Sequence, residues 1–132
     1  MYVEWKKEYC VGVARIDEQH QQLIKLLNAL YKEVSSGAPA GKSWGLLDKF
    51  SDYAETHFTT EERIAADGGV PSGQLESHKA EHDAYRTRVK SFHASMSKDK
   101  TVPVQLMAFL SKWWLNHILV LDMELGRVIN EQ

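Results

Sequence analysis

The chain has 132 residues, which is the length of one domain and is long enough to enclose a hydrophobic core. Hydrophobic residues make up 43% of it and charged residues 26%, so we expect a folded globular protein and not a disordered one. The formal charge is only −2 and the basic residues are not clustered, which argues against partners with a phosphate backbone and against an anionic membrane surface.

A few residues bear on the cellular compartment of the protein and on whether the chain crosses a membrane. Cys10 is the single cysteine and cannot form an internal disulfide, and the N-terminus lacks the basic-then-apolar order of a secretory signal. We therefore expect a cytoplasmic protein. The most apolar stretch, 103–125, predicts a buried helix and no membrane span, because it is interrupted by Lys112, Asn116, His117, Asp122 and Glu124.

An N-terminal arm over about 1–16 precedes the first predicted helix, 17–36. Asp17 is the expected N-cap, and the helix ends at a turn rich in Gly and Pro. Its inner positions step by three and four, the period of one helix face: His20, Leu23, Leu27, Leu30, Tyr31 and Val34.

Two further helices are predicted over 43–66 and 73–97, separated by a turn with three glycines and a proline. Ser43 is the expected N-cap of the first of them. The inner stripe of that helix consists of Leu47, Phe50, Tyr53 or Ala54, His57, Glu61 and Ile64. The stripe of the next helix consists of Leu75, His78, His82, Tyr85, Val89, Phe92 and Met96.

A fourth helix is predicted over 102–129, starting near Thr101 with Pro103 in its first turn, where a missing N–H costs nothing. Its expected inner stripe is Leu106, Leu110, Trp113, His117 and either Val120 or Leu121. Four periodic segments with short connections predict an all-α protein, an up-down-up-down four-helix bundle formed as a single domain over 1–132.

Six metal-capable side chains fall on these inner stripes, and a seventh, Asp122, follows His117 by five residues. His78 and His82 are four residues apart, so an ideal helix turns them by only about 40° from one another and both imidazoles can reach one metal ion. His57 and Glu61 repeat that spacing on the preceding helix. The full set is His20, His57, Glu61, His78, His82, His117 and Asp122.

A single histidine on an apolar stripe is more often a hydrogen-bonded core residue than a ligand. Five imidazoles and two carboxylates in one small core fit that explanation poorly, since each unpaired buried polar group costs roughly 1–3 kcal/mol. The pattern therefore predicts a site for two metal ions. His93 lies one residue off the stripe and is expected at the surface.

The spacing of His117 and Asp122 conflicts with a regular α-helix. Five residues place two side chains about 140° apart on such a helix, so they would not share a face. If both face the site, we expect a π-type bulge there, because the π-helix repeats from i to i+5 and such bulges recur at functional sites.

With these residues in view, the chain resembles the hemerythrins, specifically bacterial hemerythrin-like domains, over nearly all of its length. The resemblance rests on four motifs in order: Asp17-Glu18-Gln19-His20, then His57-Phe58 with Glu61-Glu62, then the His78 and His82 pair, then Trp113 with His117-Ile118 and Asp122.

That resemblance implies a non-heme pair of iron ions joined by an oxo or hydroxo group. It implies that His78, His82 and His117 hold one iron, that His20 and His57 hold the other, and that Glu61 and Asp122 bridge them. It also implies reversible binding of O2 at the iron with two histidines, and small anions such as azide as further ligands.

The ligand ratio favours the same function, because five neutral imidazoles and two carboxylates supply less negative charge than the ligands of oxidising di-iron enzymes. We therefore expect an oxygen carrier, store or sensor and not an enzyme. The sensor alternative would add a C-terminal effector domain. Two other classes remain as alternatives: a di-iron peroxidase, nitric-oxide-handling protein or ferroxidase, and a histidine phosphotransfer bundle, which needs one exposed histidine.

Four residues are expected to line the oxygen pocket: Phe58, Ala65, Trp113 and Trp114. The family often has Met at the position of Ala65, Tyr at that of Val70 and Leu at that of Trp114. We expect Ala65 to leave a gap in the pocket, and water entering there to make the oxygenated protein oxidise faster.

Overall fold

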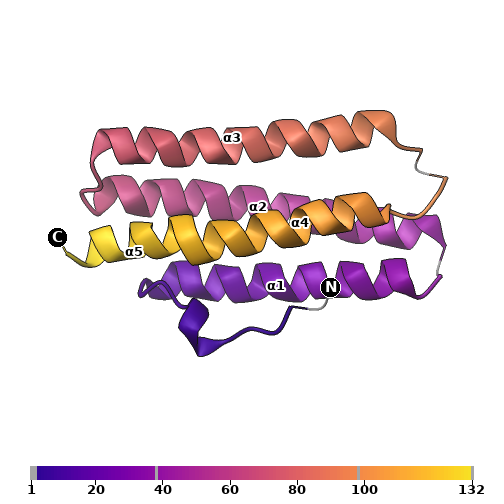
Figure 1. Ribbon diagram of the computed structural model, residues 1–132, viewed down its shortest axis with the longest axis horizontal. Helices are drawn as coiled ribbons and strands as arrows, with labels where there is room; N and C mark the ends of the chain where they lie inside the picture. Colours follow the sequence, from indigo (N-terminus) through magenta and orange to yellow (C-terminus); the bar gives the residue numbers. More distant parts are fainter. Residues whose placement is uncertain (1–2, 38, 98, 132) are drawn as a thin grey trace.

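Four helical rods lie side by side and alternate in direction in the computed structural model, which describes residues 3–37, 39–97 and 99–131 (Figure 1). The rods are α1 (Ala14–Ser35), α2 (Ala40–Asp67), α3 (Ser72–Ser95), and a fourth made of α4 (Val104–Asn116), η2 (His117–Asp122) and α5 (Met123–Asn130). The first and third rods each pack against the second and fourth. The predicted four-helix bundle is confirmed, with an N-terminal arm that includes a 3-10 turn, η1 (Lys7–Tyr9).

The helix starts differ from the predicted ones by a few residues, and a proline explains three of them. Pro39, Pro71 and Pro103 each stand immediately before a helix, with ψ between 142° and 153°. A proline has a fixed φ and lacks an N–H, so it is well suited to the residues at a helix start. Pro103 therefore precedes α4. The prediction that it lies inside the first turn was wrong.

Both predicted N-caps were wrong, because each side chain binds a different partner. Asp17 lies in the first turn of α1, and its Oδ1 accepts a hydrogen bond from the backbone N–H of Val11, 2.6 Å away. Ser43 lies inside α2, where its hydroxyl donates to the carbonyl of Ala40 and accepts from the N–H of Val102. Asp17 thus ties the arm to α1, and Ser43 ties α2 to the last loop.

The apolar core is divided along the bundle axis. The larger part includes Leu30, Leu47, Phe50 and Leu106 and extends to Phe58. The smaller part, at the opposite end of the bundle, contains Ala65, Val70, Leu125 and Val128. On α2 the buried residue Glu61 lies between Phe58 and Ala65, so a polar layer separates the two apolar regions.

The inner face of the fourth rod differs from the predicted stripe. Trp114 is 1% exposed whereas Trp113 is half-buried, since Leu106, Leu110 and Trp114 follow one another at steps of four. Val120 is 57% exposed and Leu121 half-buried, because the helix changes its repeat at His117. Sequence periodicity with a constant repeat could not anticipate that change.

The fourth rod also meets a length and composition criterion for a membrane-spanning helix, with a mean hydropathy of 1.2 over its best window. Helices in the cores of soluble proteins meet the same criterion, so this is weak support for a span. In the bundle the rod packs against α1 and α3 and carries buried His117 and Asp122.

The arm is held on the outside of the bundle by contacts at both ends. Near its start, the backbone of Val3 pairs with the side chain of Asn28 through two hydrogen bonds. Near its end, the carbonyl of Val11 lies so close to Gly126 that a Cβ there would come within 2.1 Å of it. Gly12 adopts a φ of 85°, and its carbonyl accepts a hydrogen bond from Asn130. The arm therefore joins α1 to α5.

Candidate metal centre

All seven side chains predicted as ligands meet in one buried cluster between the two apolar regions. None is more than 4% exposed. They come from every rod: His20 from α1, His57 and Glu61 from α2, His78 and His82 from α3, and His117 and Asp122 from η2. Within this set two groups have potential ligand atoms less than 4.8 Å apart: Glu61, His78, His82 and His117 in one, and His20, His57, Glu61 and Asp122 in the other.

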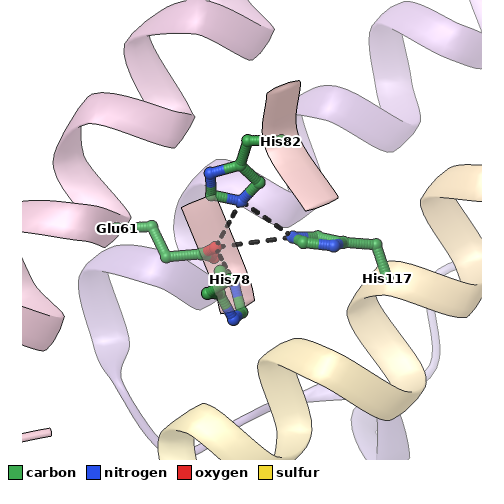
Figure 2. Close-up of side chains that lie close together, drawn as sticks. All are labelled: Glu61, His78, His82 and His117. Carbon is green, nitrogen blue, oxygen red and sulfur yellow. Dashed lines mark hydrogen bonds and ion pairs between the residues drawn. The ribbon is translucent and has the colours of Figure 1, made fainter. Parts of the chain in front are cut away.

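Glu61 belongs to both groups because its two carboxylate oxygens face opposite ways. Oε1 lies 2.6 Å from Nε2 of His78, 3.1 Å from that of His82 and 3.4 Å from that of His117. Figure 2 shows this oxygen pointing at the three imidazoles. Oε2 instead lies 3.1 Å from Nε2 of His57.

Asp122 divides its oxygens in the same way. Oδ1 lies 2.9 Å from Nε2 of His78 and 3.0 Å from that of His117. Oδ2 lies 2.7 Å from Nε2 of His20 and 3.7 Å from that of His57. Each carboxylate can thus offer one oxygen to a three-histidine position and the other to a two-histidine position.

A π-helical segment brings His117 and Asp122 onto one face. The six residues of η2 have this conformation, and both end residues point into the cluster. The π-type bulge predicted from their five-residue spacing is therefore confirmed. Between these two ends, Leu119 and Val120 are exposed on the outer side of the segment.

Two further residues, which the sequence motifs contain but to which no role was assigned, fix the orientation of two imidazoles. Nδ1 of His57 lies 2.9 Å from Oε1 of Gln19, and Nδ1 of His82 lies 2.7 Å from Oε2 of Glu62. These oxygens can only accept, so each Nδ1 carries a proton and each Nε2 faces the cluster. Gln19 had a sequence signal, since it lies three residues after Ile16 and four before Leu23 on the buried face.

Several buried atoms of the cluster lack a hydrogen-bond partner among the described residues, which tests whether metal ions would fit. Two of them face the cluster, Nε2 of His57 and Oε2 of Glu61. The other two, Nδ1 of His20 and of His117, are outer ring nitrogens, because Nε2 of both rings lies against Asp122. Nε2 of His82 and that of His117 face one another at 3.2 Å. Lone pairs of nitrogen and carboxylate oxygen pointing at common centres are the donors that borderline transition metals prefer, so the residues fit a pair of such ions.

When no metal is bound, Glu61 and Asp122 favour the protonated form of three histidines in the cluster. Burial disfavours a charged imidazole, but Glu61 and Asp122 outweigh it and raise the pKa of His57 and of His117 to about 9. The same two carboxylates raise the pKa of His78 to about 10. Conversely, burial and Asp122 disfavour ionised Glu61, yet the nearby histidines hold its pKa well below the usual range. Without metal, the imidazoles of His57, His78 and His117 therefore face the two carboxylates as imidazolium groups at neutral pH.

An aromatic wall closes the side of the cluster that faces the larger apolar region. The ring of Phe58 stacks on His82 with centroids 4.0 Å apart and on Trp114 at 5.4 Å. Trp114 also lies 5.9 Å from the ring of His57 and donates its indole N–H to the hydroxyl of Tyr85. Trp113 stacks on His117 at 4.5 Å. These rings give one face of the cluster an apolar surface.

Two other predicted positions lie apart from this wall. Ala65 is buried one turn after Glu61, in the smaller apolar region with Val70, and the gap expected beside it stays a prediction. His93 lies outside the cluster, half-buried, with its ring 5.4 Å from that of Trp44.

A family model decides the relationship of this chain to known proteins. The model described as the hemerythrin HHE cation binding domain matches residues 11–129. The chain belongs to the hemerythrin family. This confirms the resemblance based on the four sequence motifs.

Individual hemerythrins match over most of their length. A bacteriohemerythrin from Clostridium acetobutylicum is 31% identical over 126 residues, which are 91% of this chain and 95% of that relative. A hemerythrin-like protein from Naegleria gruberi is 30% identical, over 95% of this chain and 92% of its own. A crystal structure of wild-type hemerythrin superposes with a TM-score of 0.81 at 27% identity and covers 98% of both chains.

Proposed function

We propose that this hemerythrin binds O2 reversibly at a non-heme pair of iron ions, as an oxygen carrier or store or as the sensory domain of a signalling protein. The observation that carries the proposal is that Glu61 and Asp122 each direct one oxygen to a three-histidine group and the other to a two-histidine group. Two carboxylates arranged in this way suit two metal ions held side by side.

The residues divide into two unequal positions. His78, His82 and His117 would hold one iron and His20 and His57 the other, with Glu61 and Asp122 shared. A ferrous pair supplies the electrons and the open coordination position that reversible O2 binding needs. The position with one histidine fewer is the one with room for a further ligand, which can be O2 or a small anion such as azide.

The surrounding residues favour binding over oxidation of a substrate. Phe58 and Trp114 present aromatic rings to the histidines, so water and protons are kept from this side of the site. Neutral histidines also outnumber carboxylates among the proposed ligands, which limits the negative charge available to stabilise highly oxidised iron. We therefore propose a binding protein and not a di-iron oxidase.

The test combines iron content with visible absorption. Protein produced with iron should contain about two iron ions per chain and show a visible band in air that disappears when oxygen is removed and returns when it is restored. Fewer than about two irons per chain would contradict the proposal. Rapid irreversible bleaching coupled to oxidation of an added reductant would favour the enzyme alternative.

Ala65 offers a second test of the same site. If a gap beside Ala65 admits water, the oxygenated protein should oxidise irreversibly faster than a well-sealed family member does, and Ala65→Met should slow this oxidation. A wild-type protein that stays oxygenated for many hours in air would contradict the predicted gap but not the oxygen-binding function.

A further inference from the structure

We propose that Glu62 is a positioning residue that makes the two metal positions electronically unequal. It holds the imidazole of His82 through a carboxylate, whereas Gln19 holds that of His57 through an uncharged amide. This inference rests on the proposed iron pair. It adds that Glu62 and Gln19, through the histidines they hold, set the relative stability of ferric and ferrous iron at each position.

The two contacts are alike in geometry. In both, Nδ1–H of a histidine donates to a side-chain oxygen, at 2.7 Å for His82 and 2.9 Å for His57, while Nε2 faces the cluster. The two imidazoles are therefore held in the same tautomer and differ in the charge of the acceptor.

The acceptor on the two-histidine side is fixed as an amide oxygen by its surroundings. Gln19 is 1% exposed, and its NH2 group donates to the hydroxyl of Thr60. That hydroxyl in turn donates to the carbonyl of Thr56, 2.9 Å away. Because the Thr60 hydroxyl already donates to Thr56, it accepts from the NH2 group of Gln19, so the amide oxygen is the atom that meets His57 and adds no net charge.

The acceptor on the three-histidine side is a carboxylate at the edge of the cluster. The side chain of Glu62 is 23% exposed while that of His82 is fully buried. A carboxylate that accepts from the outer nitrogen of a ligating imidazole makes the imidazole a stronger electron donor. It also places a third negative charge near the metal pair, on one side of it.

The consequence concerns which oxidation state each position stabilises. Stronger donation through His82 favours ferric iron at the three-histidine position, and this position also has one imidazole more than the other. The two-histidine position lacks that extra charge, so its iron is the more easily kept ferrous and free to take up a ligand. Removing the charge of Glu62 should make the pair easier to reduce.

The experiment exchanges charge with little change in shape. Glu62→Gln keeps a side-chain oxygen that can accept from Nδ1 of His82 but removes the charge, and Gln19→Glu places a carboxylate on His57, where the Thr60 hydroxyl can turn to donate to it. Glu18→Gln is the matched control, because Glu18 is an exposed neighbour of Gln19 that pairs with Arg15 and contacts no ligand.

The measurement is a mediated redox titration of the iron-loaded proteins, followed by their visible absorption, with iron content determined for each. We expect Glu62→Gln to shift the one-electron reduction equilibrium about tenfold toward the ferrous state, which corresponds to about 59 mV. Gln19→Glu should shift it the opposite way, and Glu18→Gln should stay within about twofold of wild type.

A Glu62→Gln protein that holds two irons and titrates within about twofold of wild type would overturn the inference. So would an equal shift in Glu18→Gln, since that would indicate a general effect of charge. If Glu62→Gln loses iron, Gln19→Glu decides by the direction of its shift. A wild-type chain without an iron pair would instead refute the proposed function, before any variant is compared.

Discussion

At the scale of single residues, the cluster depends on which atom each side chain presents. The two oxygens of Glu61, and likewise those of Asp122, point to different histidines. The rings of His57 and His82 are oriented by hydrogen bonds from Nδ1 to a side chain outside the cluster. Helix spacing in the sequence indicated six of the seven side chains, and Asp122 was selected by its chemistry and by the family resemblance. It could not show Glu62 as a partner of His82, since that contact joins two helices and depends on their separation.

Trp114 gives a prediction at this scale. Trp114→Leu removes a fully buried ring that packs on Phe58 and lies beside His57. We expect the free energy of unfolding to fall by about 2–4 kcal/mol, somewhat less than for replacing such a ring with alanine. Water entering the vacated space should also speed the irreversible oxidation of the oxygenated protein. Urea unfolding and the decay of the visible band measure the two effects.

Phe92→Leu is the matched control for that variant. Phe92 is half-buried in the same apolar region, and its ring packs near Phe109 and not on a histidine of the cluster. Its replacement should cost less stability and leave the oxidation rate unchanged. If both variants oxidise at the same increased rate, Trp114 has no special role in excluding water.

At the scale of whole elements, the inner faces of the first three rods were predictable, whereas the helix ends and the inner face of the fourth rod were not. Several residues at helical spacing define one face, so a single misassigned residue does not change which face is predicted to be buried. A cap depends on one hydrogen bond, and the side chains of Asp17 and Ser43 bind the arm and the last loop instead. The π-helical segment was predictable only because two chemically marked residues, His117 and Asp122, stood five apart.

The docking of the arm on α5 gives a prediction for an element. Gly126→Ala adds a Cβ that would approach the carbonyl oxygen of Val11 to 2.1 Å, so the arm must move away. We expect a loss of about 1–3 kcal/mol in unfolding free energy, as for other overpacked sites. Hydrogen exchange at the amide of Val11 should become faster, because its bond to Asp17 depends on the same docking.

The matched control is Gly45→Ala, inside α2, where a new Cβ meets nothing within 4 Å. It gains helix propensity without a clash, so unfolding free energy should rise by about 0.5–1 kcal/mol. The same chemical change should thus have opposite signs at the two glycines. A stabilised Gly126→Ala protein would show that the arm is not packed against α5 in solution.

At the scale of the whole molecule, protons and metal compete for the same nitrogens. His57, His78 and His117 have pKa values of about 9 to 10 without metal, above the value of 6.5 for free histidine. Groups whose pKa is raised by folding contribute stability that is fully present below pH 6.5 and is lost as the pH rises through 9 to 10. Metal ions need the deprotonated imidazoles, so their binding strengthens over the same interval.

We therefore predict opposite pH trends for the two forms of the protein. Between pH 7 and about 9.5, the melting temperature of the metal-free protein should fall, while the increase caused by metal should grow. Metal binding near pH 7 should also release protons into a weakly buffered solution. Thermal unfolding of chelator-treated and iron-loaded samples at pH 6.5, 8 and 9.5 provides the comparison. A metal-free protein that becomes more stable toward pH 9.5 would contradict the assigned protonation.

The divided carboxylate of Glu61 has a consequence for how the protein fills with metal. Since one side chain serves both groups, its placement by a first ion also prepares the second group, and Asp122 acts in the same way. Loading should then be nearly all-or-none. At half the iron needed for saturation, native mass spectrometry should find mostly empty and doubly filled chains. Independent positions would instead give the singly filled species as the most abundant, so the distribution of masses reports whether the bundle contains two sites or one site of two ions.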